Sequence, residues 1–78
     1  MAWISKFEQR EGSGRVQPSK VTAFFKVFTP PDGSPIIQID THGSSDREIP
    51  GKVSQTLQLG KEAATELFDL LKQTYNFR

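Results

Sequence analysis

Alternating hydrophobic and polar side chains predict four β-strands along this chain. The clearest spans residues 20–29, which are rich in aromatic and β-branched side chains. Two further strands follow at residues 36–41 and 53–59, and a looser alternation over residues 3–10 predicts one near the N-terminus. The pattern therefore favours a sheet that uses most of the chain.

Glycine and proline separate these segments. Residues 11–15 form a glycine-rich turn or hairpin tip, and the run Pro-Pro-Asp-Gly-Ser-Pro at 30–35 is typical of a hairpin connection, because proline presets φ and Asp-Gly suits a turn. A polar loop covers residues 42–49, and Pro50, Gly51 and Lys52 close it before the next strand.

The alternation also divides the side chains between two sheet faces. One face is mainly aliphatic, and its members are Val21, Ala23, Phe25, Val27, Ile37, Ile39, Val53, Leu57 and Leu59. The other is polar with aromatic residues between, and its members are Thr22, Phe24, Lys26, Phe28, Ile36, Gln38, Asp40, His42, Ser54, Thr56 and Gln58. The aliphatic face must be covered, and one element remains to cover it.

That element is a helix predicted over residues 61–75. Its apolar stripe follows the helical period, with Ala64, Leu67, Phe68, Leu71 and Tyr75 at i, i+3, i+4, i+7 and i+11. Ala63, Leu70 and Phe77 widen the stripe beyond what one small sheet requires. The surplus predicts contact with a helix of a second copy, although an apolar solvent-facing edge would give the same pattern.

Composition narrows the class of protein. A chain of 78 residues is expected to form a single domain over residues 1–78 with one small core. The absence of cysteine excludes disulfides and cysteine–histidine zinc sites, so a homodimer is the expected route to further burial. No signal peptide or membrane-length apolar run occurs, which favours a soluble, cytoplasmic protein without a membrane partner.

The net charge of +1, with 10 basic and 9 acidic residues, does not by itself indicate a nucleic-acid partner. Such binding would need a local basic face. No nucleotide-binding or hydrolase motif is present, so we expect neither catalysis nor a small-molecule cofactor. Asp40 and His42 could be read as a catalytic or metal pair, but without a second histidine a polar surface pair is the better interpretation. Trp3 is interpreted as a core or interface anchor.

Together these elements predict an α+β fold, in which a curved, four-stranded antiparallel sheet is followed by one C-terminal helix lying across one side. The order of parts resembles the positive-cofactor-four family of single-stranded-DNA-binding transcriptional coactivators. The resemblance rests on Ile-Gln-Ile-Asp-Thr-His at 37–42, Ser-Asp-Arg-Glu at 45–48, Pro-Gly-Lys at 50–52 and Gln-Thr-Leu-Gln-Leu at 55–59. It implies a homodimer that binds single-stranded DNA or RNA in transcription, replication or repair.

The expected binding face follows from that resemblance and from the alternation. Phe24 and Phe28 flank Lys26 on one face, an arrangement suited to base stacking and phosphate contact. Lys52 matches the basic turn of the family. Lys20 and Arg47 complete the candidate nucleic-acid-binding residues, and Arg15 could extend a basic track.

Two departures from the family and two alternatives remain. Family members place a large aromatic residue and an arginine where this chain has His42-Gly43 and Asp40. Phe24 and Phe28 could instead pack a dimer interface or a second small core. The second function class is a protein-interaction module, such as a small phage or host regulator, that grips a protein with the exposed sheet face.

Overall fold

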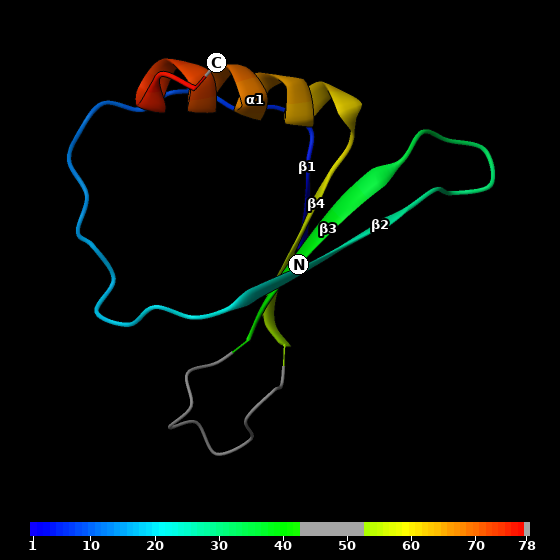
Figure 1. Ribbon diagram of the computed structural model, residues 1–78, viewed down its shortest axis with the longest axis horizontal. Helices are drawn as coiled ribbons and strands as arrows, with labels where there is room; N and C mark the ends of the chain where they lie inside the picture. Colours follow the sequence, from blue (N-terminus) through cyan, green and yellow to red (C-terminus); the bar gives the residue numbers. More distant parts are fainter. Residues whose placement is uncertain (43–52, 78) are drawn as a thin grey trace.

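The computed structural model describes residues 1–42 and 53–77. It contains strands β1 (Ala2–Ile4), β2 (Ala23–Phe28), β3 (Ile36–His42) and β4 (Val53–Leu59), followed by helix α1 (Lys61–Tyr75). The strands form one open sheet in the order β1-β4-β3-β2 (Figure 1). The predicted α+β class, with four strands before one C-terminal helix, is confirmed.

The predicted antiparallel pairing holds for β2 with β3 and for β3 with β4, but it is wrong for β1, which pairs in parallel with β4. The segment 5–22 explains the difference. It is long enough to carry the chain from β1 at one edge of the sheet to β2 at the other, so β1 is not bound to β2 by a hairpin. The sheet is therefore mixed.

Two strands are shorter than predicted. The N-terminal strand ends at Ile4 rather than at residue 10, because Ile4 pairs with Leu59 and β4 ends there. The long strand covers Ala23–Phe28 rather than residues 20–29, which is the length over which it finds partners on β3. The predicted bounds of β4 and α1 are confirmed.

One side chain changes face through a β-bulge. Thr41 pairs with Gln55 but His42 pairs with Val53, so the register skips Ser54. An extra residue in one strand reverses the alternation beyond it. The prediction that Val53 shares the face of Leu57 and Leu59 is therefore wrong, because Val53 lies opposite His42.

Helix α1 begins one residue after β4. Gly60 is the extended N-cap without a side-chain cap, and its carbonyl accepts a hydrogen bond from the Ala64 N–H at 2.9 Å. Asn76 adopts the left-handed conformation that commonly ends helices. With only Gly60 between strand and helix, α1 starts at the end of the sheet, crosses that end and continues beyond it (Figure 1).

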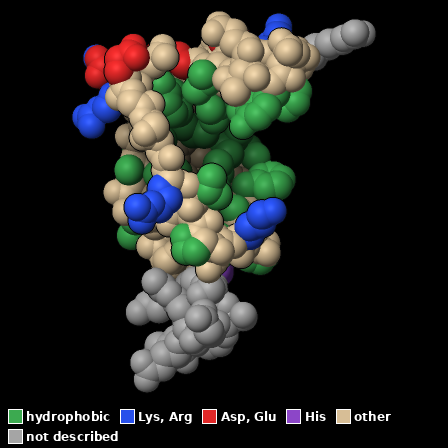
Figure 2. Space-filling view, turned by 90° about the vertical axis from the view of Figure 1, so that its left-hand side faces the viewer, with side chains coloured by type: hydrophobic (Ala, Val, Ile, Leu, Met, Phe, Trp, Pro, Cys, Tyr) green, Lys and Arg blue, Asp and Glu red, His purple; other side chains and the backbone are tan. Residues whose placement is uncertain are grey.

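The prediction that α1 covers the aliphatic sheet face is consequently wrong. In the described parts of the chain, the buried hydrophobic residues are Ile36, Leu59 and Ala63, which are 7%, 6% and 1% exposed. Phe25 and Val27, which lie on the aliphatic face of the edge strand β2, are 75% and 60% exposed. Figure 2 shows hydrophobic side chains gathered beneath the helix and over the sheet, with a hollow between them.

Candidate nucleic-acid interface

The strand registers align polar and aromatic residues in rows on one sheet face, which we call the polar-aromatic face. One row runs across the whole sheet from Trp3 through Gln58 and Gln38 to Lys26. The adjacent row contains Thr56, Asp40 and Phe24. Because alternate residues of a strand share a face, these side chains project from the same side.

The aromatic members of this face are accessible. Phe24 is 55% exposed, and its ring meets the ring of His42 edge-on with centroids 4.8 Å apart. Phe28, four residues further along β2, is also exposed. The contact with His42 restrains the Phe24 ring. Lys26 lies between the two phenylalanines along the strand.

A hydrogen-bonded network occupies the centre of the face. Gln58 Nε2 donates to Gln38 Oε1 at 2.9 Å, and Gln38 Nε2 donates to both carboxylate oxygens of Asp40 at 3.2 Å. Thr56 Oγ1 donates to Asp40 Oδ1 at 2.7 Å. The network connects β4 and β3 and fixes the orientation of side chains that would otherwise rotate freely on an open sheet.

The network keeps Asp40 ionised. The hydrogen bond from Thr56, and next the one from Gln38, lower the pKa of Asp40 below its ordinary value of 3.8, against the opposing effect of burial. Electrostatic interactions with Lys26 and with His42 lower the pKa of Asp40 further. A carboxylate therefore stands near the centre of the polar-aromatic face at neutral pH.

Removing the Thr56 hydroxyl tests this assignment. In Thr56→Val we expect the pKa of Asp40 to rise toward 3.8, because the strongest donor to its charged form is lost. A depressed pKa stabilises the fold above the unfolded-state pKa, and this contribution is lost as the pH falls through the folded-state value. Carbon-13 NMR titration of the Asp40 carboxyl group measures the shift.

The matched control is Thr65→Val on α1, whose hydroxyl donates to the Lys61 carbonyl far from Asp40. It is expected to leave the titration of Asp40 unchanged. Identical Asp40 titrations in Thr56→Val and the unaltered protein would show that the network does not set the charge of this group.

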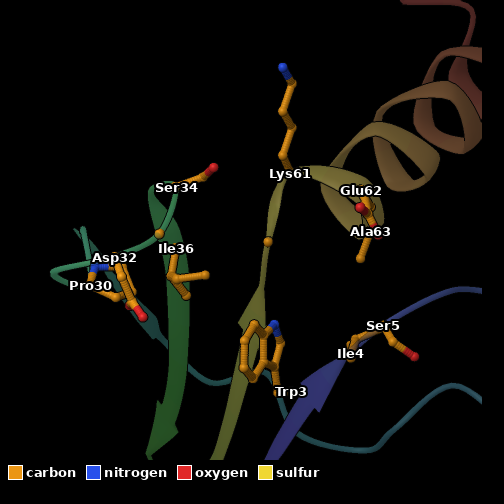
Figure 3. A pocket seen from close by; sticks show the side chains of 12 residues that line it. Trp3, Ile4, Ser5, Pro30, Asp32, Ser34, Ile36, Lys61, Glu62 and Ala63 are labelled. Atoms are coloured by element: carbon orange, nitrogen blue, oxygen red, sulfur yellow. The ribbon is translucent and has the colours of Figure 1, made fainter.

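Trp3 is a member of the face that the sequence interpretation missed. It pairs with Gln58, is 68% exposed and borders an open hollow of about 630 Å³. The hollow lies between the turn at residues 30–34 and the start of α1, while Lys61 extends away from Trp3 (Figure 3). The alternation of Trp3 with Ala2 and Ile4 shows that it lies on the face opposite to theirs. Which sheet face that is depends on the pairing of β1 with β4.

The other predicted site residues do not all join the face. Phe24, Lys26 and Phe28 share it as predicted. Lys20 precedes β2 and lies outside the sheet, and Arg15 lies in the segment 5–22, so neither is brought beside Lys26 by strand pairing. Arg47 and Lys52 lie outside the described residues. In the four described strands Lys26 is the one lysine or arginine.

Residues 1–42 and 53–77 contain no group of three or more histidine, cysteine, aspartate or glutamate side chains that could hold a metal ion. The one helix found in those ranges is too short and too polar to cross a membrane. No protein-family model, curated protein or solved structure matches this chain.

Proposed function

We propose that this protein binds single-stranded DNA or RNA on the polar-aromatic face, with little sequence preference. The observation that carries the proposal is the exposure of Phe24, Phe28 and Trp3 on one side of the sheet with Lys26 among them. Exposed aromatic rings stack on bases of any sequence, and a lysine beside them contacts phosphate. The resemblance of the sequence to the positive-cofactor-four family also favours this proposal, and it suggests a role in transcription, replication or repair inside the cell.

The position of Asp40 limits the affinity. Its charge stands in the row next to Lys26 and offsets part of the attraction that Lys26 offers to phosphate. With one cation in the described strands, we expect dissociation constants in the micromolar range, on the order of 8 kcal/mol of binding free energy. Stacking therefore contributes more of the binding than charge does.

A titration with oligonucleotides tests the proposal. Trp3 is the one tryptophan in the chain, so a stacked base is expected to quench the intrinsic fluorescence. We expect Phe24→Leu to weaken binding by about 1 kcal/mol through the loss of a stacking surface. Lys26→Ala is expected to reduce the slope of log K against log salt by about one unit, since one phosphate contact disappears. Asp40→Asn is expected to strengthen binding.

The matched control is Phe25→Leu, the next residue of the same strand, which points to the opposite face. It removes an equivalent ring and is expected to leave the affinity unchanged. If the protein binds no long oligonucleotide at low salt, or if Phe25→Leu weakens binding as much as Phe24→Leu, the interface is wrong. A polar-aromatic face that binds no oligonucleotide would instead be assigned to a protein partner, the second function class.

A further inference from the structure

The chain exposes more surface than a compact monomer of its size. Its accessible area is 7296 Å² at a mass of 8.8 kDa, whereas a folded monomer of that mass exposes roughly 4,800 Å². The Cα radius of gyration is 14.9 Å, against about 11.5 Å for a compact domain of this length. The excess, about 2,500 Å², is roughly three times the 800 Å² that each partner buries in a standard interface.

The aliphatic face is one exposed apolar surface of the chain. The registers place Phe25, Val27, Ile37, Ile39, Leu57 and Leu59 side by side there. Thr41, Gln55, Ala2 and Ile4 extend the same face. None of these residues is charged, and Leu59 alone among them is buried.

Helix α1 carries a second exposed apolar surface. Its first turn packs on the sheet through Ala63, but the side chains that follow Leu67 do not. Phe68, Leu70, Leu71, Tyr75 and Phe77 are all exposed. Figure 1 shows why, since α1 crosses the end of the sheet and continues beyond it.

The dimensions of the two surfaces match. Strands of seven residues are about 23 Å long, and an α-helix with its side chains is about 10 Å wide. The chain's own helix crosses one end of the sheet, so the rest of the face has room for one more helix. The segment 5–22 is a poor occupant, because its large hydrophobic residues are only Phe7, Val16 and Val21.

We infer that two copies of this chain interlock, with α1 of each copy lying on the aliphatic sheet face of the other, next to that copy's own helix. The interface is isologous, as expected for a two-fold dimer. It buries both exposed apolar surfaces at once and leaves the polar-aromatic face of each copy open. The dimer does not depend on nucleic-acid binding, and the two proposals are tested by separate experiments.

Cysteine cross-linking tests this arrangement cleanly, because the natural chain has no cysteine. Chains carrying Leu71→Cys and one affinity tag are coexpressed with differently tagged chains carrying Val27→Cys, and a short bismaleimide is added. The control replaces Val27→Cys with Lys26→Cys, the neighbouring residue on the opposite face. A helix control, Gln73→Cys, lies on the other side of α1 from Leu71.

We expect the two-tag product to form at least tenfold more with the pair Leu71→Cys and Val27→Cys than with either control pair. Light scattering of the unaltered protein is expected to give twice 8.8 kDa. A mass of 8.8 kDa across the micromolar range would overturn the inference. So would a dimer that links through Lys26→Cys instead, or one that links only between the two helices.

Discussion

Replacing Leu59 by aspartate is expected to unfold this protein. Leu59 is 6% exposed at the end of β4, where it pairs with Ile37 on one side and Ile4 on the other. A carboxyl group placed there loses its hydration and has no described partner in the apolar row. The cost is several kcal/mol, on the order of the ~3–5 kcal/mol that a core of this size supplies.

Far-UV circular dichroism during thermal unfolding measures the effect of Leu59→Asp. The matched control is Gln55→Asp, which introduces the same charge on the same strand and face but at an exposed position. The control is expected to cost about 1 kcal/mol or less. A cooperative transition in Leu59→Asp within a few degrees of the unaltered protein would show that this row is not the core.

Replacing Leu71 by aspartate is expected to dissociate the dimer and to lower the thermal midpoint with it. Within one copy Leu71 is 36% exposed, so an aspartate there keeps part of its hydration and costs an isolated chain less than it costs at a fully covered position. On the sheet of a second copy, the same charge is buried among Phe25, Val27 and Ile39, where it costs several kcal/mol. The size of the effect therefore depends on whether the helix is covered.

Sedimentation velocity and thermal unfolding, both measured over a range of protein concentrations, distinguish the two cases. Gln73→Asp is the control, because it places the same side chain in the same part of α1 on the opposite side. If Leu71→Asp and Gln73→Asp have the same mass and the same thermal midpoint, the apolar stripe of α1 is not buried in any assembly.

The part of the candidate site that depends on the alternation within one strand could be predicted from the sequence. The alternation of residues 24–28 places Phe24, Lys26 and Phe28 on one face, and β2 shows that arrangement. The alternation of its strand also places Asp40 on this face, but the hydrogen bonds of Asp40 with Thr56 and Gln38 depend on which strands are adjacent. The alternation of one strand contains no information about its neighbours, so the network could not be predicted.

Trp3 and Val53 show that the alternation within one strand does not decide which sheet face a residue joins. The sequence indicates a core or interface anchor at Trp3; its 68% exposure excludes the core of the single chain, and parallel pairing of β1 with β4 places it on the polar-aromatic face. Val53 was assigned to the aliphatic face, but the bulge at Ser54 moves it to the other. Neither face could be predicted, because register is set between strands, and a shift of one residue exchanges the faces.

The existence of four strands, the bounds of β4 and α1, and the amphipathic stripe of the helix could all be predicted from the sequence, because periodicity and turn residues are local properties. Tertiary structure alone decided the strand order and the direction of α1 relative to the sheet. A single glycine joins β4 to α1, and the geometry of that junction directs the helix past the end of the sheet. An amphipathic stripe indicates that one side of a helix is covered by other residues. Only the arrangement in space shows that the sheet of the same chain does not cover that side of α1.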